Sequence, residues 1–219
     1  MTNQGRRKGA PRRRTASREF RRQQLIDSTI DSIAKRGFAE TTLANVADGV
    51  GLSRGIVNLH FQSKEALLIE TLQHLAEEYR QMWSRALANA GPNPADRLRA
   101  LVALDFDPAI CNRKKIAVWF AFWGEAKSRP TYLRVCEQRD QEYLDALCAV
   151  CREIVEDGGY RELDAVLIAK GISALTDGLW LDVLVTPKQF ERETAREICF
   201  AYLASVFPRH FSAAKQSAA

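Results

Sequence analysis

The chain has 219 residues, of which 46% are hydrophobic, and a formal net charge of +5. This length accommodates one small domain and one larger domain. No apolar run approaches the roughly 18 residues of a membrane span, and no apolar segment follows the basic N-terminus as in a signal peptide, so we expect a cytoplasmic protein with no membrane partner. Five cysteines form no paired framework, which fits a reducing compartment.

The basic charge is concentrated near the N-terminus. Residues 1–64 hold 13 Lys/Arg against 5 Asp/Glu, a net charge of +8, and residues 65–219 carry a net charge of −3. Glycines, a proline and seven basic side chains without apolar periodicity predict a basic, disordered tail over residues 1–18. Such a tail is either a solvated segment or an arm that follows DNA phosphates or enters the minor groove.

Apolar residues recur at helical spacing through the rest of the chain. No stretch alternates long enough to build a sheet, so the pattern predicts an all-α fold. The predicted helices cover residues 17–36, 42–47, 53–61, 63–88, 94–105, 113–127, 130–157, 162–185 and 187–207. Domains are expected at 19–64 (DNA binding) and 65–208 (ligand binding and dimerisation), followed by a flexible tail at 209–219.

Residues 41–64, TTLANVADGVGLSRGIVNLHFQSK, predict a helix-turn-helix. Thr41 or Thr42 caps the first short helix, glycines permit a tight turn, and Ser53 caps the second helix. Two short helices at this spacing typically place a recognition helix in the DNA major groove. The apolar residues of the second helix, expected in the core of this domain, are Val57 and Phe61, with Ile56 and Leu59 beside them.

Arg54 and Asn58 are the candidates for reading bases, because their spacing places them on one helix face and their side chains suit guanine and adenine edges. Gly55 lets the helix backbone approach DNA closely. The candidates for phosphate contacts are Thr41, Thr42, Ser53, His60 and Lys64. For Thr42 and Ser53, capping alone is a second interpretation, compatible with the first.

These residues carry a family resemblance. The segments Thr41-Thr42, Val46-Ala47, Gly51-Leu52-Ser53, Gly55, His60-Phe61 and Ser63-Lys64-Glu65 resemble the N-terminal signature of TetR-family regulators, over residues 20–68. The resemblance implies an all-helical homodimer in which a three-helix head binds a double-stranded DNA operator and a larger body binds a small effector. We expect dimerisation through the helices at 130–157 and 162–185, packed as a four-helix bundle with the partner.

The body resembles the choline-responsive, BetI-type branch of that family. The segments that carry this are Asp105-Phe106-Asp107-Pro108, Trp119, Ala121-Phe122-Trp123 and the run from Ala174 to Leu181. Two positions depart from the pattern: the branch tends to have asparagine at position 105, and many family members have tyrosine at position 58. The resemblance implies choline or another quaternary ammonium as the effector.

An aromatic effector site is predicted on the same residues. Trp119 and Trp123 share a helix face with Phe122 beside them, and Trp180 lies on another helix. Aromatic faces and a carboxylate are the natural partners of a quaternary ammonium, and Glu125 and Asp177 are the acidic candidates. Tyr143 is expected to close the pocket with its hydroxyl. The alternative is that this aromatic face is simply core and that Asp177 caps a chain end or pairs with an arginine.

The sequence therefore predicts a ligand-responsive repressor released from a palindromic operator by a small molecule. It lacks a phosphate-binding loop, a metal-spaced histidine cluster and a nucleophile elbow, so no enzyme and no cofactor are expected. Two alternatives are a TetR-type regulator of an efflux or catabolic operon with an unrelated apolar ligand, and a helical adaptor that does not bind DNA. Activation remains an alternative to repression, and Cys148-Ala149-Val150-Cys151 is expected to pack rather than to bind metal or undergo redox chemistry.

Overall fold

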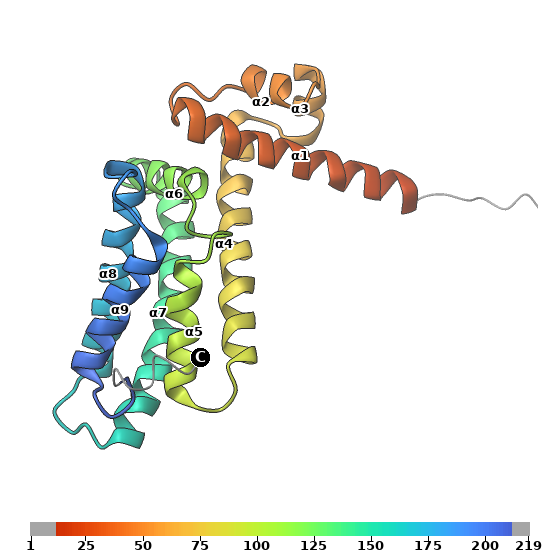
Figure 1. Cartoon of the computed structure of the whole chain (residues 1–219). Coiled ribbons are helices and arrows are strands. Elements are labelled where there is room, and N and C mark those ends of the chain that lie inside the picture. The colour runs from red at the N-terminus through yellow and green to blue at the C-terminus, as the bar shows by residue number, and fades with distance from the viewer. Residues whose placement is uncertain (1–11, 212–219) are drawn as a thin grey trace, which may run out of the picture. The chain divides into compact units, whose positions relative to one another are not determined.

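The computed structural model describes residues 12–211, with side chains from Arg18 onward. Within that range the chain forms nine helices and no strand, which confirms the all-α prediction (Figure 1). The helices are α1 (Arg12–Arg36), α2 (Leu43–Gly49), α3 (Arg54–His60), α4 (Lys64–Asn89), α5 (Pro94–Asp105), α6 (Arg113–Ala126), α7 (Pro130–Gly158), α8 (Ala165–Val185) and α9 (Arg192–Val206). None of these helices combines the length and apolar character needed to cross a bilayer.

The chain divides into two compact units within α4, after Thr71 rather than after Lys64 as predicted. The first turns of α4, including the buried Leu67 and Leu68, belong to the N-terminal unit. We call the first unit the head and the second, from Leu72, the body.

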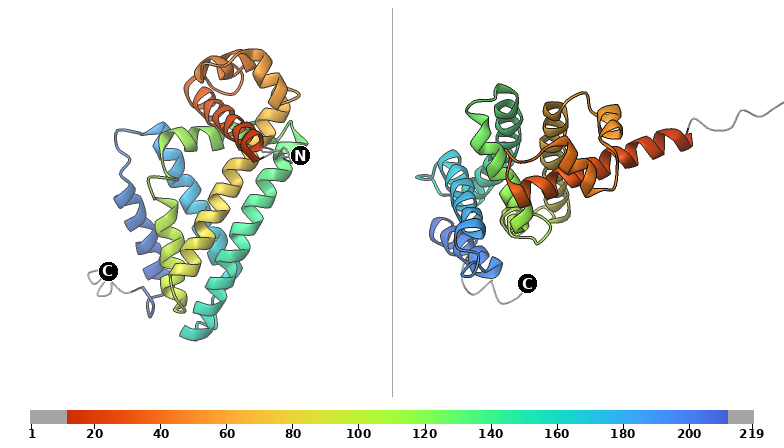
Figure 2. Two further views of the ribbon diagram at one scale, coloured as in Figure 1. Left: turned by 90° about the vertical axis from the view of Figure 1, so that its right-hand side faces the viewer. Right: turned by 90° about the horizontal axis from the view of Figure 1, so that it is seen from above.

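In the head, α2 and α3 pack against each other and against α1 (Figures 1 and 2). The Ser28 hydroxyl of α1 donates to the backbone carbonyl of Val46 at 2.8 Å and ties α1 to α2. Gly49 faces this serine so closely that an added Cβ would collide with its hydroxyl. Gly51 has φ +64°, the left-handed conformation that the turn between α2 and α3 requires.

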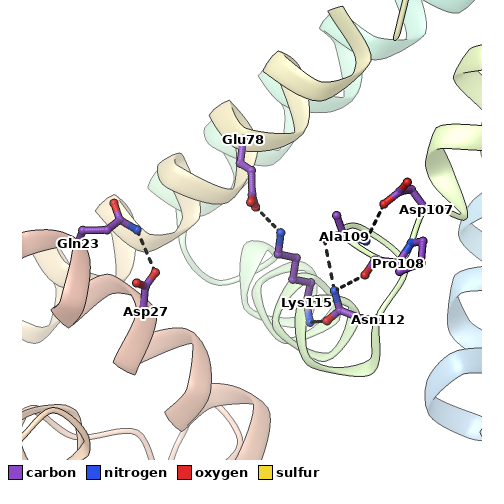
Figure 3. Close-up of polar contacts among 8 residues, drawn as sticks. All are labelled: Gln23, Asp27, Glu78, Asp107, Pro108, Ala109, Asn112 and Lys115. Carbon is purple, nitrogen blue, oxygen red and sulfur yellow. Dashed lines mark hydrogen bonds and ion pairs between the residues drawn. The ribbon is translucent and has the colours of Figure 1, made fainter. Parts of the chain in front are cut away.

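The body is built from α5, α7, α8 and α9, which lie side by side, with α6 packed on α7 and α8 (Figures 1 and 2). Polar side chains cap three helices of the body: Asn93 caps α5, Asn112 caps α6 and Asp164 caps α8. The Lys115 ammonium lies 2.6 Å from the Glu78 carboxylate, and this ion pair joins α6 to α4. Figure 3 shows the ion pair together with the Asn112 cap.

Helix α1 begins at Arg12, earlier than the predicted start at Ser17. The prediction of a disordered tail over residues 1–18 is therefore wrong for residues 12–18. This stretch contains no glycine or proline, and arginine and alanine are good helix formers. Residues 1–11 of the predicted tail lie outside the described residues.

The C-terminal end of the body also differs from the prediction. A flexible tail was expected from residue 209, but Phe211 is fully buried, and His210 approaches both Tyr160 (3.1 Å) and Asp157 (2.9 Å). Apolar burial thus holds the chain through Phe211. Residues 212–219 lie outside the described residues.

The last helix begins at Arg192 and not at Pro187. The Thr186 carbonyl accepts hydrogen bonds from the amides of Gln189 and Phe190, so the residues after Pro187 form a turn before the helix. Elsewhere the predicted helix ends agree with the structure within a few residues.

The five cysteines are buried free thiols. Cys148 and Cys151 lie in the core of the body, which confirms the prediction that this pair packs. Burial raises the pKa of Cys151 to about 12, so its thiol is protonated at neutral pH.

Candidate DNA-binding surface and effector site

Helix α3 has one buried and one exposed face. Val57 is buried beneath it, and Arg54, Gly55 and Asn58 are exposed. Arg54 and Asn58 lie one turn apart and share the exposed face. The geometry thus presents the two predicted base-reading side chains to solvent, and their contact with bases stays a prediction.

Leu59 was expected in the core but has 73% of its surface exposed. Helix α3 has only two turns, so Val57 and the following Phe61 fill the space beneath it. Leu59 instead joins Arg54, Gly55 and Asn58 on the outer face. An apolar side chain there suits the methyl group of thymine, a contact that the sequence reading missed. Its position four residues after Gly55 is the signal that could have placed it.

The two threonines before α2 have different roles. Thr41 is only 1% exposed, and its hydroxyl donates to the Gly37 carbonyl at 2.9 Å. The prediction that Thr41 contacts DNA is therefore wrong. Thr42 is exposed and forms a capping box with Asn45, in which each residue's backbone N–H donates to the other's side-chain oxygen.

Ser53 occupies the N-cap position of α3, but its side chain makes no capping hydrogen bond within the described residues. The predicted N-cap position is therefore confirmed, and the expected side-chain capping bond is not formed. The Ser53 hydroxyl is exposed, and the predicted phosphate contact stays a prediction.

Arg22 of α1 fixes the C-terminal end of α3. It donates to the His60 carbonyl at 2.9 Å, pairs with Glu70 of α4, and places its guanidinium carbon 4.8 Å from the Phe61 ring centroid. Partial burial, together with the positive charges of Arg22 and neighbouring arginines, lowers the pKa of His60. His60 is therefore a neutral imidazole at pH 7, able to donate one hydrogen bond to a phosphate.

Lys64 is half-buried at the start of α4. Its ammonium lies 6.0 Å from the Phe38 ring centroid, so the charge sits over an aromatic face of the head. The position is compatible with its predicted phosphate contact, which stays a prediction.

The body contains a buried arginine surrounded by aromatic rings. The guanidinium carbon of Arg139, on α7, lies within 6 Å of four ring centroids. The rings, which we call the aromatic cage, are Tyr79 of α4 (4.3 Å), Trp119 (4.9 Å) and Trp123 (5.9 Å) of α6, and Trp180 of α8 (5.7 Å). This is the geometry of a cation–π site, and the cation in it belongs to the chain itself.

Asp105 holds two rings of the aromatic cage through hydrogen bonds. Its two carboxylate oxygens accept hydrogen bonds from the hydroxyls of Tyr79 (2.6 Å) and Tyr143 (2.8 Å), and its carbonyl accepts one from the Trp180 indole (2.8 Å). Complete burial raises the pKa of Asp105 to about 6, although the two tyrosine hydrogen bonds and the Arg139 charge lower it. At pH 7 the carboxylate form predominates.

Asp177 is the second carboxyl group near the cage. Burial raises its pKa to about 6, an effect opposed by the positive charge of Arg139. Asp177 and Asp140 line one pocket of about 730 Å³ between α7 and α8. A smaller pocket of about 310 Å³ between α4 and α7 is lined by Arg139 itself, with Glu77 and Glu142 at its wall.

The structure brings together only some of the predicted effector residues. Trp119, Trp123 and Trp180 form the cage, and Tyr143 reaches it through Asp105. Two predicted residues lie elsewhere. Phe122 packs edge-on against Tyr132, with 5.4 Å between the centroids, and Glu125 pairs with Arg129 at 2.9 Å. Neither side chain contributes to the cage in this structure, and their contact with an effector stays a prediction.

Three central residues were missed: Tyr79, Asp105 and Arg139. Tyr79 and Arg139 had no predicted role in the site, and Asp105 was noted only as a departure from a family pattern. A signal for Arg139 was present in α7, where the buried Cys136 and Tyr143 flank it at helical spacing. An arginine on such a stripe indicates a buried cation in need of partners.

A basic head with an exposed recognition helix and a helical body with a buried polar site define a helix-turn-helix transcriptional regulator with a ligand-binding domain. Two family models match: bacterial regulatory proteins of the TetR family over residues 25–71, and the C-terminal domain of BetI-type transcriptional repressors over residues 94–208. The chain belongs to the TetR family, with a BetI-type C-terminal domain.

Proteins of similar sequence belong to the same family. The HTH-type transcriptional regulator BetI of Stenotrophomonas maltophilia is 34% identical over 183 residues, which is 84% of this chain and 91% of the relative. BetI of Burkholderia thailandensis is 34% identical over 186 residues, or 85% of this chain and 93% of the relative. The chain is accordingly a DNA-binding repressor that responds to a ligand, and not an enzyme.

Solved structures share the fold. A transcriptional regulator from Pseudomonas aeruginosa PAO1 has a TM-score of 0.77 and 29% identity, covering 88% of this chain and 94% of that one. A regulator from Saccharomonospora viridis, solved in complex with choline, has a TM-score of 0.74 and 22% identity, covering 84% and 96%. The second likeness concerns the fold alone.

Proposed function

We propose that the effector of this repressor carries a quaternary ammonium group, as choline does. The observation that supports the proposal most strongly is the aromatic cage: four rings already surround a cation, with the carboxyl groups of Asp105 and Asp177 nearby. A quaternary ammonium donates no strong hydrogen bond, so ring faces and anionic charge are what it requires. The choline complex of the Saccharomonospora viridis regulator supports the same ligand class.

In the proposed DNA complex, the outer face of α3 enters the major groove. Arg54 and Asn58 read base edges, Leu59 contacts a thymine methyl, and Thr42, Ser53, His60 and Lys64 hold phosphates. The net charge of +8 on residues 1–64 supports DNA binding by this part of the chain, because phosphate neutralisation supplies much of the affinity.

We further propose that the protein acts as a homodimer formed by α7 and α8. An apolar stripe runs along the exposed side of α8, where Leu167 is 67% exposed and Leu181 and Val185 follow at helical spacing. Small residues, Ala174 and Gly178, lie between them and permit close approach of a partner helix. A two-fold dimer would present two recognition helices to a palindromic operator.

Effector binding then acts through the dimer geometry. The productive spacing of the recognition helices is about 34–36 Å, one turn of DNA. An effector that binds more tightly to a conformation with another spacing lowers operator affinity by that difference in binding free energy. No contact between effector and DNA is needed.

The effector class is tested by calorimetric titration with choline and with 3,3-dimethyl-1-butanol, in which carbon replaces the quaternary nitrogen. The two molecules share shape and hydroxyl and differ in charge. We expect choline to bind at least about tenfold more tightly, the value of one desolvated cation–π contact. Equal affinities would favour the alternative of an apolar ligand.

The dimer is tested by sedimentation of the wild type and of Leu181→Glu, which buries a charge in the proposed interface. We expect a wild-type dimer, and for the variant a monomer that binds operator weakly. Glu162→Gln is the control, because Glu162 is exposed outside the helical stripe. A wild-type monomer that still binds operator tightly would refute the dimer model.

A further inference from the structure

The cation in the aromatic cage is Arg139 itself, and the rings around it come from three other helices. Trp119 and Trp123 lie on α6, Tyr79 on α4 and Trp180 on α8. Tyr79 and Trp180 are held in place by hydrogen bonds to Asp105. The four rings thus come from helices other than α7, which supports Asp105 through Tyr143 and supplies Arg139 as the cation.

The hydrogen bonding of Arg139 is incomplete. Its Nη1 donates to Asp140 at 2.6 Å, but its Nε is buried and meets no acceptor among the described residues. Arg22 in the head offers a contrast, because it reaches a backbone carbonyl as well as a carboxylate. A buried guanidinium with an unsatisfied N–H is held less firmly than a fully paired one. The rings are its principal partners.

A cavity beside Arg139 has room for its side chain outside the aromatic cage. Arg139 lines the pocket of about 310 Å³ between α4 and α7, and Glu142 lines the same pocket. Asp140, its present hydrogen-bond partner, has a half-exposed side chain. A guanidinium that swung out of the cage into this pocket would keep a carboxylate partner and gain water.

We propose that Arg139 is an internal competitor of the effector: in the effector-free protein its guanidinium fills the cation site, and a quaternary ammonium binds by displacing it. The inference rests on the proposed effector class. Arg139 thereby sets the effector concentration at which the repressor responds. The site accepts the effector only while Arg139 is withdrawn. The apparent association constant of the effector therefore equals the intrinsic constant multiplied by the fraction of protein in which Arg139 is withdrawn.

The first test compares choline affinity, measured through tryptophan fluorescence, in the full-length wild type and in Arg139→Gln. We expect the variant to bind choline about tenfold or more tightly, because the competing cation is gone. Arg85→Gln, a change of the same charge at an exposed position of α4, is expected to leave the affinity unchanged. Unchanged or weaker binding by a folded Arg139→Gln variant would overturn the inference.

The second test uses methylguanidinium, which reproduces the head group of the arginine. We expect it to quench tryptophan fluorescence in Arg139→Ala, where the cage is vacated, and not in the wild type at the same concentration. Failure of methylguanidinium to bind the folded alanine variant would overturn the inference. If neither the glutamine nor the alanine variant folds, Arg139→Lys decides. Its ammonium is more strongly hydrated and competes less well for rings, so choline should bind more tightly than in the wild type.

The role of Arg139 and the effector class can be disproved separately. Wild-type protein that binds choline, with no gain in Arg139→Gln, overturns the internal competitor and keeps the effector class. Absence of choline and tetramethylammonium binding in the wild type and in every variant overturns both.

Discussion

The hydroxyl of Tyr143 donates to a carboxylate oxygen of Asp105 at 2.8 Å, across 38 positions of sequence. This bond joins α7 to the end of α5 inside the body, and Tyr79 makes the matching bond from α4 to the other oxygen. Two tyrosine donors and the charge of Arg139 thus compensate a carboxylate that burial destabilises.

Asp105→Asn should stabilise the protein at neutral pH. Burial raises the pKa of Asp105 from 3.8 to about 6, so the folded protein holds this proton more tightly than the unfolded chain does. Ionisation therefore lowers the free energy of unfolding as pH rises from about 4 to about 6, by roughly 3 kcal/mol once complete. The neutral amide removes that loss. We expect a higher Tm than the wild type at pH 7.5 and little difference at pH 4, by thermal denaturation.

Asp48→Asn is the matched control, because Asp48 is exposed on the head. It should change the Tm little at either pH. A folded Asp105→Asn protein that is less stable than the wild type at pH 7.5 would show that the tyrosine hydrogen bonds outweigh the cost of burying the charge.

Choline affinity should rise with pH between 5 and 7.5. Asp105 and Asp177 both have a pKa raised to about 6 by burial, so both are largely protonated at pH 5 and ionised at pH 7.5. A cation binds their carboxylate forms more tightly, since it interacts favourably with the negative charge. Calorimetry in buffers of equal ionic strength measures the effect. Asp177→Asn should flatten the pH profile, and a profile that falls with pH would contradict the placement of the cation beside these groups.

Arg54→Ala and Ser53→Ala should separate base reading from phosphate contact. Arg54 is exposed on α3, and its loss should weaken specific binding by about 1–3 kcal/mol and relax discrimination at one base pair. Ser53→Ala should weaken binding to every sequence alike, because a phosphate contact carries no base information. Fluorescence anisotropy with a panel of operator variants measures both. Unchanged discrimination by Arg54→Ala would remove Arg54 from the base-reading surface.

Leu59→Ala should affect recognition and leave stability nearly unchanged. With 73% of its surface exposed, Leu59 contributes little to the core, and we expect a change below about 0.5 kcal/mol in the free energy of unfolding. Leu25→Ala, at a fully buried position of α1, should cost about 2–5 kcal/mol. The Leu59→Ala protein should also lose the preference for thymine at one operator position. A loss of stability like that of Leu25→Ala would place Leu59 in the core after all.

The head was predictable from sequence because its determinants are local. Thr42 and its capping box, Gly51 in its left-handed turn, and buried Val57 and Phe61 all act within a few residues. The errors at Thr41 and Leu59 concern which side of a short element faces the core. In an element of one or two turns, too few apolar positions exist for periodicity to decide this.

The effector site was only partly predictable because long-range packing assembles it. Trp119, Trp123 and Trp180 were found by residue type. Asp105, however, acquires its role from partners 26 and 38 positions away, and sequence gives no indication of such pairings. Arg139 was overlooked because a charged residue in a helix is normally solvated, and only the burial of its neighbours reveals its environment.

The most direct test of a quaternary-ammonium-controlled repressor is operator binding by the purified protein during titration with choline. The probe is the DNA upstream of its own gene, at fixed salt because phosphate contacts make affinity salt-dependent. We predict that choline releases the wild type from this DNA and that Trp123→Ala, which removes a wall of the cage, requires a much higher concentration. Tight, specific binding that choline, betaine aldehyde and glycine betaine all leave unchanged would contradict the proposed effector.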